Sequence, residues 1–490
     1  MRLSISLLSI LVLSETCRAS DFNELIEKAP QGANAVMAVD VTKTLQTPFA
    51  KMNGWDKAIH EGSADRPLYL PPEADKLVAA AQIDITRDLN RSWEVSLFGL
   101  LESMPLGLVA RAEGGYVDKI EDVEVAWLPS DAYVLKAGET TLMMQAPADR
   151  QAVARWISSQ KSGLATMQMS DYLGAALAAI KSQPHVVMAL DTSHAIQRHR
   201  VEENLQQSGF LEKHSLKLDQ VADLITSLQG IVIEITFTDK ATAMARIDFA
   251  QTVPFNKTVA KALVLATLES KHMSLPGSDS FTFSVVDKSI IVESDLLLDS
   301  VRRILSLMEP PSTKFSSLKN VNVEKPSGDD IAQNSLAYFH ATQSLIKDLR
   351  KHARSYNSDS YWMDRYVKKI DSLPILHVDN DLLDYGEKLS ETLESMSGAR
   401  KNDRLQAGVA ARGDLSQGTI SNNYGYGSGS GYGYGNYSYS NPRSRETAAG
   451  NDVANAAAAG TSVKIQGWEL IDTATIQVRR GLTMRYNIEF

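Results

Sequence analysis

The chain has 490 residues, of which 43% are hydrophobic and 22% are charged, a balance typical of globular proteins. Its 50 basic and 59 acidic residues give a net charge of −9, which provides no general attraction to nucleic acids or anionic membranes. The composition therefore disfavours nucleic-acid partners, and the length predicts about three domains.

The first nineteen residues, MRLSISLLSILVLSETCRA, have the pattern of a signal peptide. Arg2 provides the charged start, and an apolar run from Leu3 to Leu13 follows it. This run is far shorter than the ~20 residues that a membrane-spanning helix needs. We therefore expect an exported protein, periplasmic or extracellular, with no membrane span in the mature chain. Cleavage after Ala19 would also remove Cys17, the only cysteine, so no disulfide is expected.

Two short segments look like copies of each other. Val36–Gln46 reads VMAVDVTKTLQ and Val187–Gln197 reads VMALDTSHAIQ. Each predicts a buried strand that ends at an aspartate, Asp40 or Asp191, and runs into a helix start. We favour a helix cap for both aspartates, since capping explains the residue type without any partner. The alternative is a pair of carboxylates at a pseudo-symmetric interface.

A second pair of segments preserves the same order of parts. Thr141–Ile157 reads TLMMQAPADRQAVARWI and Ser289–Leu305 reads SIIVESDLLLDSVRRIL. Each predicts an apolar strand, a break with an acid and then an amphipathic helix. Together the two pairs predict an α+β fold with two duplicated sheet-plus-helix domains, residues 20–165 and 166–311.

Further strands and helices are expected between the paired segments. Ile231–Phe237 and Ala245–Phe249 alternate well around a turn near Asp239, which predicts a hairpin. Helices are expected near Pro72–Ala81 and Leu216–Leu228, where they would cover one face of each sheet. The remaining candidate strands are Val95–Leu101, Tyr133–Leu135 and Phe281–Val286.

The composition changes after the second repeat. Residues 312–330 are polar and contain proline, which is typical of a linker. Residues 331–398 then predict a helical segment. Its three helices are expected at Ile331–Tyr356, Tyr361–Leu373 and Leu382–Met396, broken at Asn357 and Pro374.

Residues 399–463 lose periodicity and fill with Gly, Ser, Asn, Ala and Tyr, so most of this span is predicted to be disordered. It contains the tract NNYGYGSGSGYGYGNYSYSNP, which holds no lysine or arginine and therefore lacks the electrostatic half of single-strand binding. We favour a spacer, because ordering such a tract costs entropy. Glycan contact and self-association remain alternatives. The candidate interaction residues in the tract are Tyr424, Tyr426, Tyr432 and Tyr434.

The last segment, residues 464–490, regains a helical pattern and predicts a short amphipathic helix. Its apolar seam repeats at three and four residues, as in a heptad. The helix could dock back on the helical segment or pair with a second copy. The seam residues are Trp468, Ile471, Thr475, Val478 and Leu482, of which Trp468, Val478 and Leu482 are candidate interaction residues.

Signatures of common catalytic sites are missing. The nine histidines show no zinc pattern, and we find no nucleophile elbow, Walker loop or dinucleotide fingerprint. We therefore expect no cofactor and no metal, and we assign no catalytic residue. Asp379, Asp381 and Asp384 resemble a calcium loop only loosely, because Leu383 stands where an oxygen ligand is wanted. A solvated helix start is the favoured interpretation.

Five stretches together resemble a family of exported planctomycete proteins with a Tyr/Gly-rich C-terminal region. The resemblance covers most of the mature chain and implies export. It implies no activity and transfers no site residue. The stretches are VMAVDV, NGWDKAIHEGSADRPLYLPPEADKLVAAAQID, ARAEGGYVD, YWMDRYVKKIDSLPILHVDNDLLDYGE and WELIDTATIQVRRGLTMRYNIEF.

The sequence as a whole favours a non-enzymatic binding or structural protein of the cell envelope. An envelope protein or a glycan is the expected partner. The alternative is an envelope-side hydrolase of polysaccharide or peptide, because scattered carboxylates that only the fold brings together leave no linear motif.

Overall fold

The computed structural model describes residues 22–490 except 61–66, 72, 86–88, 163–168, 182–183, 194, 311–326, 352–359, 372, 374, 376 and 416–441. Residues 399–415 and 442–462 are described by their backbone alone. The predicted signal peptide therefore lies outside the described residues. The described strands are β1 Ala35–Asp40, β2 Ala74–Asp84, β3 Asn90–Leu100, β4 Tyr116–Ile120, β5 Val123–Leu128, β6 Ala132–Lys136, β7 Thr141–Ala146, β8 Val186–Asp191, β9 Leu228–Phe237, β10 Ala241–Phe249, β11 Thr282–Val286 and β12 Ser289–Leu296.

All of these strands form one antiparallel sheet, in the order β11-β12-β10-β9-β8-β1-β2-β3-β7-β6-β5-β4. At its centre the two copied segments pair with each other as β1 and β8, and Met37 lies opposite Met188. From this pair outward the first repeat runs β1-β2-β3-β7-β6 and the second runs β8-β9-β10-β12-β11. Strands at the same distance from the centre are therefore equivalent. The predicted α+β class is confirmed, and the two repeats share one sheet.

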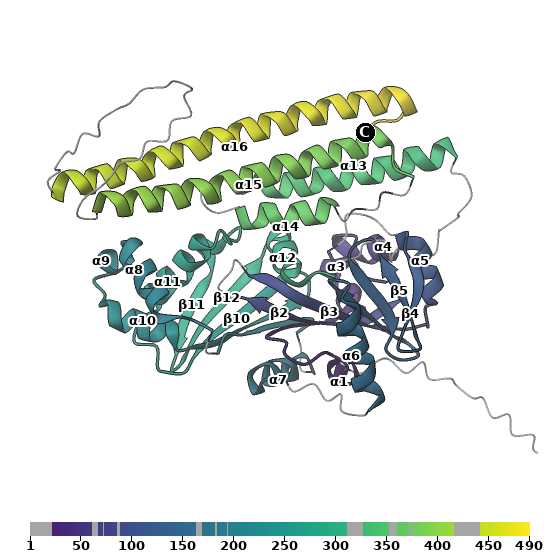
Figure 1. The fold of residues 1–490 in the computed structure, drawn as a ribbon, viewed down its shortest axis with the longest axis horizontal. Helices are drawn as coiled ribbons and strands as arrows, with labels where there is room; N and C mark the ends of the chain where they lie inside the picture. Colours follow the sequence, from purple (N-terminus) through teal and green to yellow (C-terminus); the bar gives the residue numbers. More distant parts are fainter. Residues whose placement is uncertain are drawn as a thin grey trace, which may run out of the picture.

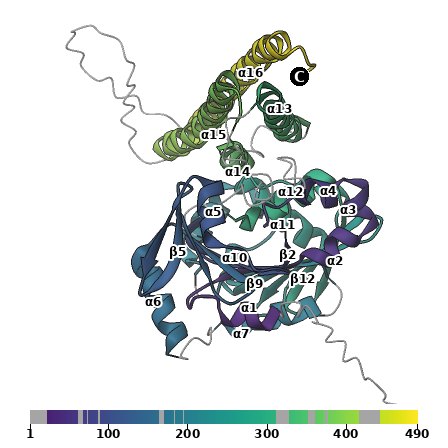
Figure 2. The ribbon, with the colours of Figure 1, turned by 90° about the vertical axis from the view of Figure 1, so that its right-hand side faces the viewer.

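Helices cover both faces of the sheet, because strands near its centre are apolar on both sides (Figures 1 and 2). One face, here called the Met37 face, carries Met37 and Val39 of β1, and the opposite Val36 face carries Val36 and Ala38. On the Met37 face lie α2 Val41–Gln46, α3 Pro48–Met52, α4 Trp55–His60, α5 Leu106–Glu113, α8 Arg198–Gln207, α9 Phe210–His214, α10 Leu218–Thr226, α11 Lys257–Ser270 and α12 Leu298–Leu305. On the Val36 face lie α1 Phe22–Glu27, α6 Arg150–Lys161 and α7 Asp171–Ala178.

The helix predicted at Pro72–Ala81 is wrong, since these residues enter strand β2. The segment ADKLVAAAQID contains a run of alanines, which favours a helix in isolation. In the fold, Leu77 packs in the core of the Met37 face and Val78 in the core of the Val36 face. Small and apolar side chains suit a central strand with helices on both sides, so tertiary packing overrides the local preference.

The other predicted elements of the body agree with the structure. Helix α10 lies within the predicted Leu216–Leu228, and β9 and β10 form the predicted hairpin. The predicted strands near Val95–Leu101, Tyr133–Leu135 and Phe281–Val286 correspond to β3, β6 and β11.

A layer of long helices lies over the Met37 face of the body (Figure 1). It consists of α13 Gly328–Lys351, α14 Ser360–Asp371, α15 Asn380–Leu415 and α16 Pro442–Tyr486, and the first three contain most of the helical segment predicted from the sequence. Trp362 Nε1 donates to Ser274 O over 2.8 Å, and Arg302 Nη1 donates to Asp348 Oδ2 over 2.9 Å. Polar contacts thus link this layer to the second repeat. Burial raises the pKa of Asp348, although Arg302 opposes the shift.

Helices α15 and α16 extend further than the sequence predicts. Residues 399–415 and 442–463 are helical, whereas disorder was predicted for both. Alanine, the strongest helix former, is frequent in both stretches, for example in NAAAAG of α16. The sequence prediction gave more weight to the glycine and asparagine around these alanines. The four candidate tyrosines between α15 and α16 lie outside the described residues. So do the predicted helix breaks at Asn357 and Pro374.

Helix α16 docks on α15 through the predicted seam. Ile471 and Leu482 are each 1% exposed, and Trp468 and Val478 pack against the same apolar cluster. Thr475 Oγ1 lies 2.7 Å from the hydroxyl of Tyr385 on α15. The seam therefore serves packing within the chain.

Candidate functional site

The two duplicated aspartates lie at opposite ends of the β1–β8 pair. The backbone N–H of Asp40 donates to His185 O, and that of Asp191 donates to Asn34 O. The interpretation as paired carboxylates is therefore wrong, because antiparallel pairing centred on Met37 and Met188 places equivalent residues at the strand ends far from each other.

The capping prediction is confirmed for one of these aspartates. Asp40 Oδ1 accepts from Lys43 N over 3.0 Å at the start of α2. Asp191 Oδ1 accepts instead from Ser193 N over 2.9 Å, and α8 begins only at Arg198. The cap is therefore wrong for Asp191, where a turn replaces the helix start.

The acids near residue 380 hold the end of α16. Asp379 Oδ1 accepts from Asp381 N over 2.9 Å at the start of α15, so the predicted helix start is confirmed. The prediction that it is solvated is wrong for Asp379, which is buried. Asp379 Oδ2 accepts from Arg485 Nη1 and from the Tyr486 hydroxyl, each over 2.6 Å. Burial opposes ionisation of Asp379, but the hydrogen bonds from Tyr486 and Arg485 outweigh it and lower its pKa.

The other predicted interaction residues do not form an open site. Leu482 is buried, Val478 is half-buried, and the Arg350 guanidinium lies 4.8 Å from the Trp468 ring centroid. Tyr424, Tyr426, Tyr432 and Tyr434 lie outside the described residues. Within the described part of the chain, no group of three His, Cys, Asp or Glu residues could hold a metal ion. Among the same residues, no helix is both long and apolar enough to span a bilayer.

The Met37 face is sealed in the first repeat and open in the second. In β2 and β3 of the first repeat, Leu77, Ala79 and Phe98 are each 0% exposed. Pairing from the centre outward makes them equivalent to Ile231, Ile233 and Ile247 of β9 and β10. All three isoleucines are partly exposed, as are their neighbours Ala243 and Ala245.

Helix α11 adds further apolar surface to this open face. Its sequence, KTVAKALVLATLES, is apolar almost all round, a pattern usually found in buried helices. Here Ala260 and Leu263 are buried, while Val264, Leu265 and Leu268 are partly exposed. The sequence analysis did not single out this helix, although three charged residues in fourteen are few for a surface helix.

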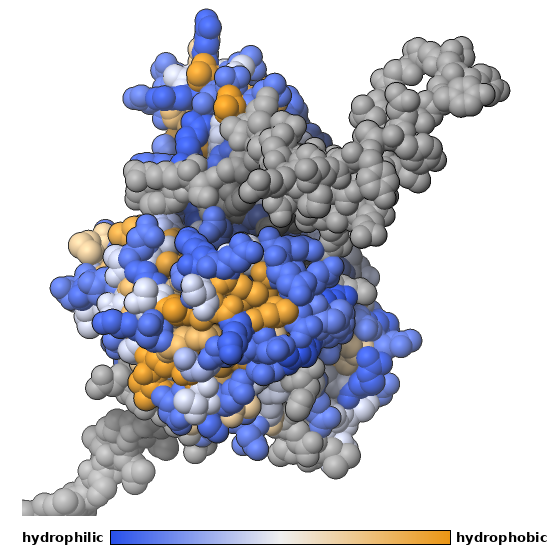
Figure 3. Space-filling view, turned by 90° about the vertical axis from the view of Figure 1, so that its left-hand side faces the viewer, coloured by the Kyte–Doolittle hydropathy of each residue, from blue (hydrophilic) through white to orange (hydrophobic). Residues whose placement is uncertain are grey.

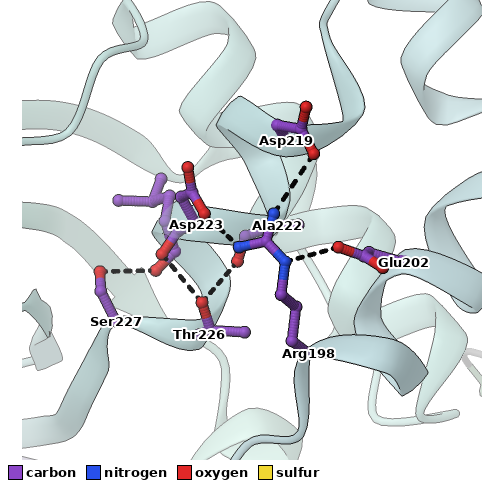
Figure 4. A network of polar contacts seen from close by, with 8 residues as sticks. Arg198, Glu202, Asp219, Ala222, Asp223, Thr226 and Ser227 are labelled. Atoms are coloured by element: carbon purple, nitrogen blue, oxygen red, sulfur yellow. Dashed lines mark hydrogen bonds and ion pairs between the residues drawn. The ribbon is translucent and has the colours of Figure 1, made fainter.

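Helices α8 and α10 stand beside this surface and are joined by Arg198 (Figure 4). Arg198 Nε donates to Glu202 over 2.6 Å, Nη2 to Asp219 over 3.3 Å, and Nη1 to Asp223. The hydrogen bonds with Asp223 and Glu202 raise the pKa of Arg198. The network is exposed to solvent, so it adds little to stability.

The space-filling view shows the same feature from the end of the molecule that carries α8 to α11 (Figure 3). Apolar residues gather there in one broad patch with polar residues around it. We call this surface the open apolar face and define it by the partly exposed residues Ile231, Ile233, Ala243, Ala245, Ile247, Val264, Leu265 and Leu268.

A small hollow lies near the Met37 face, between residues of both repeats. Val39, Trp55, Leu68 and Phe237 are among the residues that line it. It has no room for anything much larger than a water molecule. This hollow is therefore too small for a ligand, and the open apolar face is the better candidate.

No protein-family model and no curated protein matches the chain. Among solved structures it resembles crystal form I of TP0453, with a TM-score of 0.34 and 10% identity over 60% of this chain and 96% of that chain. Crystal form III of TP0453 gives a TM-score of 0.33 and 11% identity over 58% of this chain and 96% of that chain. At TM-scores this low, neither likeness carries an argument about this chain.

Proposed function

We propose that the chain is a non-enzymatic binding protein of the cell envelope and that it captures a partner on the open apolar face. The observation that carries this proposal is the partial exposure of Ile231, Ile233 and Ile247, where the equivalent positions of the first repeat are sealed. A contiguous exposed apolar patch with a polar rim is typical of an interaction site. The predicted signal peptide supports export to the envelope.

The chemistry of the open apolar face suits binding better than catalysis. Its defining residues are aliphatic, and general acid–base catalysis needs titratable groups in place. Lys261, the nearest cation on α11, donates to the backbone oxygen of Asp279 over 2.6 Å. A hydrolase would need carboxylates that converge on a cleft. The acids Asp379 and Asp348 are instead engaged by Arg485 and Arg302.

Envelope capture with the full chain and a Leu265→Glu variant tests this proposal. The new charge lies on the far side of α11 from its buried residues, so it should abolish capture and leave the fold intact. Ile476→Glu on α16, where the side chain is 67% exposed, is the matched control. We expect this control to retain the partner. Equal capture by both variants would exclude the open apolar face as the binding surface.

A further inference from the structure

We propose that the partner contributes an extended strand, which pairs with the free edge of β11 and packs its apolar side chains against α11, the part of the open apolar face that adjoins this edge. This inference rests on the proposed function, because it names what that surface binds. It is argued from the hairpin β4–β5 of the first repeat, which has no equivalent among the described strands of the second repeat.

The two repeats differ at their outer edges. In the first repeat β6 pairs with β7 on one side and β5 on the other, so that Val134 lies between Met144 and Ala126. The equivalent strand β11 pairs with β12, where Phe283 lies opposite Val292. Among the described strands, none pairs with the other side of β11. The edge that β5 covers in the first repeat is therefore bare in the second (Figure 1).

The helices next to these edges differ in the same way. Helix α5 joins β3 to β4, packs against β4 and β5, and buries Leu106, Val109 and Ala110. Helix α11 joins β10 to β11 at the equivalent place and packs against β11. Its Val264, Leu265 and Leu268 stay partly exposed. The hairpin β4–β5 is thus the cover that α11 lacks.

The chemistry of the β11 edge fits a strand. Free strand edges present unpaired N–H and C=O groups that template another strand, and proteins usually guard them with proline, lysine or a bulge. The sequence TFSVV of β11 contains neither proline nor a charged residue, and its pairing with β12 is regular. An added strand would continue this ladder, as β5 continues the ladder of β6.

Strand β5 also indicates which side chains the partner strand would carry. In VEVAWL, Ala126 and Leu128 are buried on the Met37 face, two residues apart. A strand with small or aliphatic residues at alternate positions would point them toward α11 in the same way. An acyl chain could cover the apolar side chains of α11 but would leave the β11 edge unpaired, whereas a strand accounts for both features.

The experiment uses the full chain and, as probe, a fluorescent synthetic peptide with the sequence of the chain's own hairpin, Tyr116–Leu128. Binding is measured by anisotropy, and hydrogen exchange reports protection of the β11 amides. The control peptide has the same sequence with alternate backbone nitrogens methylated, so that it cannot donate to an edge. We expect the first peptide alone to protect the amides of Phe283 and Val285, which face the free edge of β11.

Two protein variants separate strand pairing from apolar contact. Val285→Pro removes a donor that faces the free edge of β11, since the N–H groups of Ser284 and Val286 already pair with β12. Leu265→Glu places a charge on α11. We expect each to weaken the peptide's affinity by about tenfold or more, as the loss of one or two such contacts predicts. Ile476→Glu should bind as the unmodified chain does. Circular dichroism and melting temperature check that each variant folds.

The outcomes distinguish the two proposals. Binding that Leu265→Glu weakens but Val285→Pro and the methylated peptide leave unchanged would overturn the strand and leave the proposed function standing. No binding at a peptide concentration of about 1 mM, with no protection of β11, would likewise overturn the strand. A dimer of the full chain that Val285→Pro dissociates would show that a second copy, and not a separate partner, fills the edge. Envelope capture that ignores Leu265→Glu would remove the proposed function as well.

Discussion

The two repeats of this protein share a sheet and a strand order, yet only one of them completes its core. In the first repeat, the hairpin β4–β5 covers helix α5, helix α2 packs on β2, and Leu77 and Phe98 are 0% exposed. In the second repeat, no described element takes the place of that hairpin, and the Met37 face stays partly open. The difference teaches that two repeats can share a sheet framework and still differ in whether the same face is core or surface.

The largest expected difference in stability between the repeats comes from a matched pair of charge substitutions on α5 and α11. Val109→Glu on α5 buries an unpaired carboxylate at a position that is 0% exposed, so we expect a loss of at least about 3 kcal/mol in the free energy of unfolding. Leu265→Glu on the equivalent helix α11 should cost about 1 kcal/mol or less, since the new charge reaches water. Denaturant unfolding measures both. Similar losses would mean that α11 is covered as fully as α5.

A second pair of substitutions compares equivalent aliphatic positions on β2 and β9. Leu77→Ala removes a fully buried side chain and should cost about 2–5 kcal/mol. Ile231→Ala removes a partly exposed one and should cost less than half as much, because less apolar surface returns to water. Denaturant unfolding of the two variants measures both losses. A larger loss for Ile231→Ala would contradict an open face in the second repeat.

The smallest expected effect concerns the helical layer, where Arg485 and Tyr486 at the end of α16 donate to Asp379. We call these contacts the clamp; they involve neither sheet repeat. The lowered pKa of Asp379 means that the clamp stabilises the fold above the pKa of the unfolded side chain and that this stabilisation is lost as the pH falls through the folded pKa. We expect Asp379→Asn to cost about 1.5–3 kcal/mol at pH 7, as charged hydrogen bonds do. The difference from the unmodified chain should shrink below about pH 4.

A control for the clamp lies two residues away. Asp381 also accepts from Arg485, over 2.5 Å, but its side chain is 61% exposed. Asp381→Asn should therefore have a smaller effect than Asp379→Asn at every pH, because solvent screens exposed pairs. Equal and pH-independent losses for the two variants would show that ionisation of Asp379 does not hold the end of α16.

Local patterns were sufficient for several elements. The repeated strand with Met37 and Met188, the cap at Asp40 and the seam through Ile471 and Leu482 all follow from the identity and spacing of nearby residues, and the structure confirms them. These features depend on interactions within a few residues, which the sequence displays directly.

Other features depend on residues far away in the chain. The alanine run of β2 is a strand only because helices pack on both of its faces. Asp191 caps no helix, since its Oδ1 accepts from Ser193 N and α8 begins only at Arg198. Nothing in the order of residues alone distinguishes these outcomes. Tertiary packing overrides weak local preferences, so the sequence prediction was wrong at both places.

The sequence by itself determined the duplicated strands, the α+β class and the amphipathic end of the chain. Tertiary structure decided that the two copies join in one sheet at Met37 and Met188, and that α11 lies half-exposed beside the bare edge of β11. The physical reason is that the spacing of hydrophobic residues indicates which side chains tend to be buried. Whether they are buried depends on another element that covers them. Helix α5 has such an element in β4–β5, and the described strands of the second repeat include no equivalent for α11.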